Sequence, residues 1–185
     1  ITHVLAPDLT AGAAARQLGA IAERVELTGT VTETHPPLHA NEAERRALAQ
    51  IMTGRHIWLA AAPTLPEARA ALVAHEAALH YNHRALLILA DLAPSIMPAI
   101  RAEAEALGLA TVLRSEDQDP TPDDHVLIAD EADEMGLWYR LAPVSFMGGT
   151  LLAGDGAAPR HPFEPAALGS AIIHGLLTET HSAEW

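Results

Sequence analysis

Short apolar runs alternate with longer amphipathic stretches along most of the chain. The stretches at 41–52 and 97–107 carry Ala, Leu and Ile at helical spacing and are bounded by Asn41 as a cap and Gly108 as a stop. A strand followed by a helix about every 25 residues is typical of a parallel sheet with helices on both faces. The pattern predicts an α/β fold with a Rossmann-like, doubly wound, mostly parallel sheet. Its strands are expected at 57–61, 86–89, 111–113, 126–128, 144–147 and 171–173.

The first 37 residues have a pattern of their own. A short strand is expected at 2–7, a helix from a cap at Asp8 or Thr10 to about Glu23, and a second strand at 25–29. The next residues, 32–37, read Thr-Glu-Thr-His-Pro-Pro, a composition typical of a linker.

The composition of the chain argues against several classes of function. The chain has 185 residues, 49% of them hydrophobic, so it can bury a core. Its formal net charge of −13 argues against electrostatic binding of nucleic acid, which requires a basic face. The absence of cysteine excludes disulfides and thiolate metal sites. No apolar run reaches the roughly 18 residues of a membrane span. The chain begins with Ile1 and not Met, and we expect it to be part of a longer protein.

The candidate chemistry lies near the C-terminus. The strand at 144–147 runs into Gly148 and Gly149, where the backbone can approach a ligand closely. Glu164 follows at the expected start of a short helix, whose free N–H groups favour a phosphate, while a carboxylate can accept hydrogen bonds from ribose hydroxyls. Phosphate and ribose together indicate a nucleotide. The alternative is a common glycine turn followed by a helix-capping Glu.

Two motifs in this region resemble the C-terminal part of bacterial 3-deoxy-D-manno-octulosonic acid (Kdo) transferases. That family has Gly-Gly-Ser-Leu, and residues 148–151 read Gly-Gly-Thr-Leu. It then has His-Asn-Pro-Leu-Glu-Pro-Ala-Ala, and residues 160–167 read Arg-His-Pro-Phe-Glu-Pro-Ala-Ala, which places Arg160 at the family's His. The family's Asp-Thr-Met-Gly-Glu-Leu is represented by Asp130 and Glu134, and Thr28–Gly29 matches the point where its two domains join.

The resemblance implies a glycosyltransferase of the GT-B type, of which this chain is mainly the C-terminal half. Residues 1–34 would be the end of the N-terminal domain and linker, and 35–185 the nucleotide-sugar-binding domain. The implied reaction moves Kdo from CMP-Kdo to a lipid A precursor with inversion, at the cytoplasmic face of the bacterial inner membrane. Acceptor and membrane would meet only the missing part, and no cofactor is implied. The catalytic base would also lie in that part, so no catalytic residue is assigned here.

The donor-binding residues implied by the resemblance are Gly148, Gly149, Thr150, Arg160, His161, Pro162, Glu164 and Glu134. The family's basic Arg-His-Pro-Glu-Arg motif is not kept: residues 92–96 read Leu-Ala-Pro-Ser-Ile. Since basic side chains are the simplest means of holding a phosphate, we expect donor affinity to be weak.

Two alternatives stay open. The chain could belong to a transferase for another nucleotide sugar, or to a non-catalytic relative that acts as a binding or scaffold module. A metal site formed by His75, His80 and His83 is disfavoured, because their spacings of five and three do not place them on one helical face. We expect solvated histidines near a helix end, and no metal.

Overall fold

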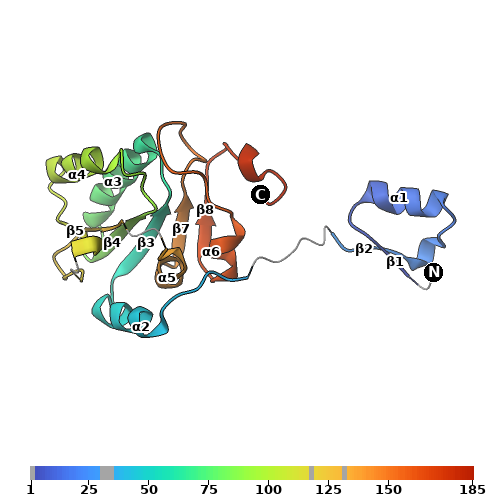
Figure 1. The fold of residues 1–185 in the computed structure, drawn as a ribbon, viewed down its shortest axis with the longest axis horizontal. Helices are drawn as coiled ribbons and strands as arrows, with labels where there is room; N and C mark the ends of the chain where they lie inside the picture. The colour runs from blue at the N-terminus through green and yellow to red at the C-terminus, as the bar shows by residue number, and fades with distance from the viewer. Residues whose placement is uncertain (1–2, 30–35, 117–118, 131–132) are drawn as a thin grey trace. The chain divides into compact units, whose positions relative to one another are not determined.

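The computed structural model describes residues 3–29, 36–116, 119–130 and 133–185. It divides into two compact units, Ile1–Pro36 and Pro37–Trp185 (Figure 1). This division falls close to the boundary expected between residues 34 and 35. The expected linker lies mostly outside the described residues, and the assignment of the first unit to an N-terminal domain stays a prediction.

The first unit consists of a helix and two paired strands. β1 (Val4–Ala6) and β2 (Val25–Leu27) are parallel, and α1 (Leu9–Gln17) joins them with η1 (Ala22–Arg24). Asp8 caps α1, because its carboxylate accepts the Ala11 amide at 2.7 Å. The expectation of a helix to about Glu23 was wrong: α1 ends six residues earlier than that, before Gly19, which has a φ of 95°.

The second unit is built on one six-stranded parallel sheet in the order β5-β6-β4-β3-β7-β8. Every pairing in this sheet is parallel. All six expected strands are confirmed, and so is the fold class. Their bounds are β3 His56–Ala61, β4 Ala85–Ala90, β5 Thr111–Leu113, β6 Val126–Ala129, β7 Val144–Met147 and β8 Ala171–Ile173.

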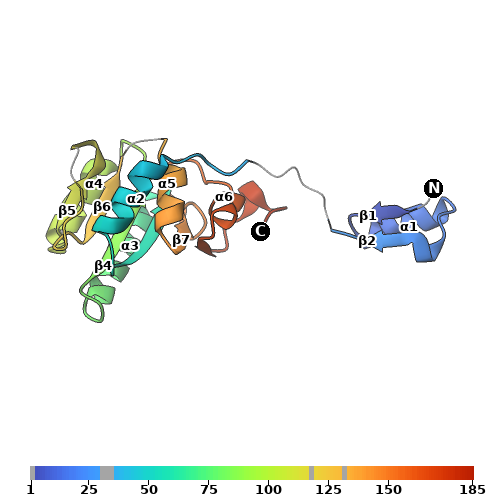
Figure 2. The same cartoon turned by 90° about the horizontal axis from the view of Figure 1, so that it is seen from below.

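Helices cover both faces of the sheet (Figures 1 and 2). On one face, α3 (Leu65–Leu79) and α4 (Met97–Ala106) pack on β4 and β6 in an apolar cluster. On the other face, α2 (Glu42–Ile51) and α5 (Met135–Leu141) form a second cluster around Trp138. The short α6 (Phe163–Ala167) lies beside α5 and β8. Because all six strands are parallel, their carboxyl ends lie at the same edge of the sheet.

The chain reverses direction across the sheet between β3 and β7. From β3 the chain proceeds through α3 to β4 on one side, and from β6 it returns through α5 to β7 on the other side of β3. In open parallel sheets, ligands bind beside such a switch point, outside the carboxyl ends of the strands. The loop after β7, which begins with Gly148, therefore lies where a ligand is expected.

The expectation that His75 is solvated near a helix end was wrong, because His75 lies in the core. It is fully buried in α3. Its Nδ1 accepts the Trp58 Nε1–H at 3.1 Å, and its Nε2 donates to the His125 carbonyl at 2.8 Å. Desolvation is the main reason that the pKa of His75 falls to about 4, so the ring is neutral near pH 7.

No helix among the described residues is long and apolar enough to cross a bilayer.

Candidate donor-binding site

The turn after β7 is pressed against the end of β3. The Gly148 amide donates to the Ala61 carbonyl at 2.8 Å. A Cβ at Gly148 would lie 2.1 Å from the Ala62 carbonyl oxygen, far inside van der Waals contact. Ala62 itself has a φ of 49°, an unusual conformation for a residue with a side chain. Gly148 is therefore required for the two strand ends to meet.

A buried carboxylate, Glu67, holds the rest of this turn. It accepts the amides of Gly149, Leu151 and Leu152 at 2.6, 2.8 and 3.1 Å. It also accepts the Thr64 amide at 2.8 Å, while the Thr64 hydroxyl accepts the Glu67 amide at 3.4 Å, so the two form the capping box of α3. One side chain thus joins the start of α3 to the loop after β7.

Glu67 is only 1% exposed, yet it remains ionised. Burial alone would raise its pKa, but four backbone N–H donors together outweigh burial and hold the pKa below its usual value. The carboxylate thus occupies the amide nest of the turn as an anion would. The contacts of Glu67 span more than 80 residues and gave no sequence signal.

These contacts bear on the expected roles of Gly148, Gly149 and Thr150. The Gly148 and Gly149 amides already have acceptors within the chain. Thr150 is buried, and its hydroxyl oxygen accepts the Gly175 amide at 2.9 Å. The turn therefore contributes shape to the edge of the sheet, and direct contact between these residues and a donor stays a prediction.

Gly149 also brings the second motif to the same place. It has a φ of 72°, and a Cβ there would lie 2.7 Å from the Pro159 Cγ. The loop that contains Pro159 therefore rests on the glycine turn. The next residue, Arg160, lies at the carboxyl edge of the sheet, where its Nη1 donates to Asp91 directly after β4 at 2.8 Å. Gly149 and Arg160 are 11 residues apart in the sequence, and the packing of Pro159 on Gly149 brings them together.

Arg160 is the centre of a partly exposed ion-pair cluster. Its Nε and Nη2 donate to the two carboxylate oxygens of Glu164 at 2.7 and 3.2 Å. Burial would lower the pKa of Arg160, but its hydrogen bonds to Glu164 and Asp91 outweigh this and raise it. Asp91 has a φ of 56°, an uncommon conformation that turns the chain sharply after β4. The arginine is thus permanently charged and fixed in direction.

Tyr139 of α5 lies beside this cluster. Its hydroxyl is buried and makes no hydrogen bond of normal geometry among the described residues, although Glu164 and Arg160 are close enough to interact with it. Burial, and next the negative charge of Glu164, raise the pKa of the Tyr139 phenol. A buried polar group without a partner is uncommon in native proteins and marks a place that a ligand or water can complete. Asp91 and Tyr139 were both missed from the sequence, and only the position of Asp91 at a strand end could have indicated it.

His161 and Pro162 precede α6, as expected, but this helix has only five residues. The amides at its start already have acceptors: Glu164 N–H donates to the His161 carbonyl at 3.1 Å, and Phe163 N–H to the His161 Nδ1 at 3.2 Å. The expected phosphate site at this helix start therefore has no support from the hydrogen bonding. The His161 ring contacts the rings of Phe163 and His181, with centroids 5.1 and 4.9 Å apart.

Glu134 lies in another cluster at the same edge of the sheet. Both of its carboxylate oxygens accept from Arg114 at 3.0 Å, and Arg114 Nη2 also donates to Glu44 at 2.7 Å. Arg114 lies over the Trp138 ring, 5.9 Å from its centroid. Since Tyr139 faces Glu164 and Trp138 faces Arg114, adjacent residues of α5 contact the two clusters. The structure pairs Glu134 with Arg114 and not with Arg160.

The parallel sheet and the motifs at its switch point define a class of protein before any relative is considered. They define the doubly wound α/β class, whose members bind ligands, often nucleotides, outside the carboxyl ends of the strands at the switch point.

Known proteins agree with this class, although no family model matches the chain. The chain is 26% identical over 182 residues to the 3-deoxy-D-manno-octulosonic acid transferase of Haemophilus influenzae, covering 96% of this chain and 41% of that protein. It is also 26% identical to the C-terminal CMP-Kdo binding domain of WaaA from Acinetobacter baumannii. The match to that crystal structure has a TM-score of 0.62 and covers 71% of this chain and 70% of the WaaA domain. The predicted resemblance to Kdo transferases is confirmed.

A more distant similarity is to Anabaena HepE in complex with UDP and glucose, at 13% identity and a TM-score of 0.46. It covers 92% of this chain and 43% of that one.

Proposed function

We propose that the Pro37–Trp185 unit binds the CMP-Kdo donor of an inverting glycosyltransferase. The relatives support this: one is a Kdo transferase, and the other is a CMP-Kdo binding domain of the same fold. Since the chain spans about two fifths of the Haemophilus enzyme, the complete activity is itself part of the proposal.

The observation that carries the proposal is the position of Arg160. It is a cation at the carboxyl edge of the sheet, next to the switch point, and its side chain is 21% exposed. Asp91 and Glu164 neutralise its charge and accept three of its five N–H groups, so it would offer the remaining two to a donor phosphate as fixed hydrogen-bond donors. Arg160 would thus replace part of the hydrogen bonding that the family's basic motif supplies elsewhere.

Glu164 and Tyr139 would complete the site. A carboxylate offers about four lone-pair positions, and Arg160 uses two of those on Glu164. The remaining positions on Glu164, which is 20% exposed, can accept the two hydroxyls of a ribose. The buried Tyr139 hydroxyl lies next to the same carboxylate and can turn toward a bound oxygen.

The remaining parts of the reaction belong to residues beyond this chain. By similarity, a lipid A precursor would be the acceptor, at the cytoplasmic face of the inner membrane, and another domain would supply the base. We therefore expect no Kdo transfer by the 185-residue chain alone. Transfer to a lipid A acceptor by this chain would show that the assignment of its missing parts is wrong.

A second function is favoured by one observation: the loop after β4 has lost its basic residues. Leu92 and Ile96 are buried in the cluster under α3 and α4, so these positions belong to the core and not to a phosphate site. This fits a transferase with another nucleotide sugar, or a binding module that needs no leaving-group stabilisation.

Nucleotide titration by calorimetry distinguishes these functions. CMP should bind, weakly, and more tightly than UDP. Glu164→Gln keeps the shape but loses the charge, so CMP affinity should fall about 10- to 100-fold, corresponding to about 1.5–3 kcal/mol. The matched control is Glu42→Gln, which also disrupts a carboxylate paired with an arginine four residues away, in α2. Tighter binding of UDP would favour another nucleotide sugar, and no binding of either would favour the scaffold.

A further inference from the structure

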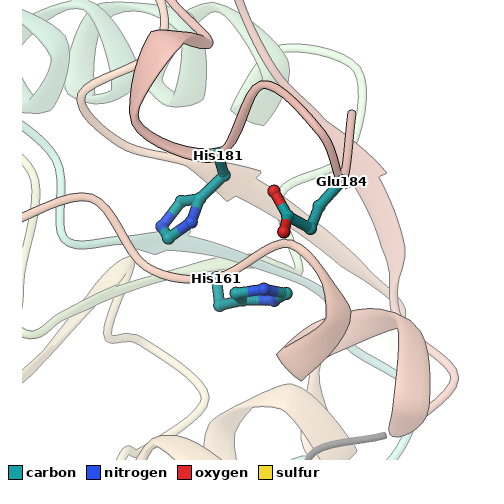
Figure 3. Close-up of side chains that lie close together, drawn as sticks. All are labelled: His161, His181 and Glu184. Atoms are coloured by element: carbon teal, nitrogen blue, oxygen red, sulfur yellow. The ribbon is translucent and has the colours of Figure 1, made fainter. Parts of the chain in front are cut away.

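Three side chains that can bind a metal meet where the C-terminal tail lies on the loop before α6. They are His161, His181 and Glu184, and one ligand atom from each lies within 4.8 Å of the other two. Figure 3 shows them converging from the loop and from the tail. The three residues are half-buried, so the space between them is partly shielded from solvent.

The fold of the C-terminal tail places the side chains of His181 and Glu184 on the same face of one turn. The chain forms η3 (Glu179–His181) and continues as a turn, in which the Glu184 amide donates to the His181 carbonyl at 3.0 Å. A separation of three residues in a helical turn places both side chains on the same face. The next residue, Trp185, stacks on His174 after β8 with ring centroids 4.3 Å apart, which anchors the end of the tail.

The hydrogen bond of the His181 imidazole fits metal binding. His181 Nε2 lies 3.4 Å from the Pro159 carbonyl, to which only a protonated nitrogen can donate, so Nδ1 keeps its lone pair. A metal-bound histidine commonly donates its other N–H to a backbone carbonyl in this way. On His161, the Nδ1 lone pair accepts the Phe163 amide at 3.2 Å, a long hydrogen bond that a metal would replace.

We propose that His161, His181 and Glu184 form a binding site for a divalent transition metal, of which Zn²⁺ is the best match. Two imidazoles and one carboxylate are a usual Zn²⁺ ligand set, with a fourth position for water or a ligand oxygen. Zn²⁺ bonds of about 2.0–2.2 Å place ligand atoms about 3.4 Å apart, so small side-chain rotations close the site. This revises the expectation of no metal and does not depend on the proposed function.

The site would tie the tail to the loop that carries Arg160. Pro159, whose carbonyl accepts from His181, and His161 flank Arg160 in the sequence. A bound metal would therefore restrict the same loop that rests on Gly149.

The test is a Zn²⁺ titration of the chelator-treated 185-residue chain against a competing chromophoric chelator, with melting curves in parallel. We expect one equivalent to bind and to raise the melting temperature. His181→Ala and Glu184→Gln should each weaken the site at least tenfold and reduce the shift in melting temperature. The control is His80→Ala, which removes the exposed His80–Glu76 pair, whose Nε2 and Oε1 are 3.1 Å apart, and should change neither.

Glu184→Gln is nearly isosteric, so it keeps the test valid if His181→Ala fails to fold. Equal Zn²⁺ affinity in the parent and in Glu184→Gln and His181→Ala would overturn the proposal, since scattered surface histidines would then account for binding. No binding by the parent at micromolar Zn²⁺ would also overturn it. Mg²⁺ in place of Zn²⁺ should not bind in this range, because Mg²⁺ prefers oxygen ligands; equal binding of Mg²⁺ would show a carboxylate site without the histidines.

Discussion

Two glutamates at the carboxyl edge of the same sheet have opposite kinds of partner. Glu67 is buried, and its acceptors are filled by backbone amides of the turn after β7 and of the start of α3. Glu164 is partly exposed, and its partner is another partly exposed side chain, Arg160. Backbone amides cannot move away without unfolding the turn, whereas an arginine can share its carboxylate with a ligand. The first glutamate therefore builds the edge of the sheet, and the second can serve a donor.

The largest expected effect is the loss of unfolding free energy when the buried Glu67 is changed. Glu67→Gln places an amide group where only acceptors fit, so at least one of the buried N–H groups around it loses its partner. An unsatisfied buried donor costs about 1–3 kcal/mol, and the lost charge adds to it, so we expect a loss of roughly 3–5 kcal/mol in unfolding free energy. Urea unfolding measures it.

Glu164→Gln is the matched variant for that experiment. It should cost no more than about 1 kcal/mol, because a partly exposed ion pair contributes little to stability. Equal losses of unfolding free energy in the two variants would remove the distinction between a structural and a ligand-binding glutamate.

The next effect concerns His75, a second buried polar group with internal partners. Its pKa is depressed from 6.5 to about 4 in the folded chain, so between these values the unfolded chain binds the extra proton. Unfolding free energy should therefore fall as pH falls from about 6.5 to 4, by about 3 kcal/mol from this group. His75→Gln removes the titration, and its urea unfolding curves should show a flatter pH dependence. An unchanged pH slope in His75→Gln would mean that other groups cause the acid sensitivity.

Local pattern predicted most of this fold, since each strand of the sheet is a short apolar run between helix signals. The helix α1 was predicted to be too long, because apolar residues after Gly19 continue the helical spacing although the helix ends before this glycine.

The site was predicted less completely. Arg160 and Glu164 were found because they lie within one motif, four residues apart. Asp91 and Glu67 could not be assigned partners, because 69 and 82 residues separate them from Arg160 and Gly149 and only the strand order brings them together. The approach of His161 to His181 and Glu184 was also missed, because 20 residues separate His161 from His181.

The smallest expected effect is a difference in unfolding free energy between Gly149→Ala and Gly169→Ala. Gly149 lies where the turn held by Glu67 contacts the loop that carries Arg160. Gly149 and Gly169 both have positive φ, 72° and 82°, so Ala at either position should carry a similar backbone strain of about 1 kcal/mol. Only at Gly149 does the new Cβ meet another residue, Pro159, at 2.7 Å; at Gly169 nothing lies within 4 Å. Gly149→Ala should therefore cost about 1 kcal/mol more than Gly169→Ala in urea unfolding, through local overpacking.

The same pair of variants links the turn to the proposed donor site. Because Pro159 precedes Arg160, the new Cβ in Gly149→Ala displaces the loop that carries the guanidinium, and CMP affinity should fall several-fold in a calorimetric titration. Gly169→Ala should leave CMP affinity unchanged. If both variants lose the same stability and keep full CMP affinity, Pro159 moves without consequence, and the Gly-Gly turn does not determine where Arg160 points.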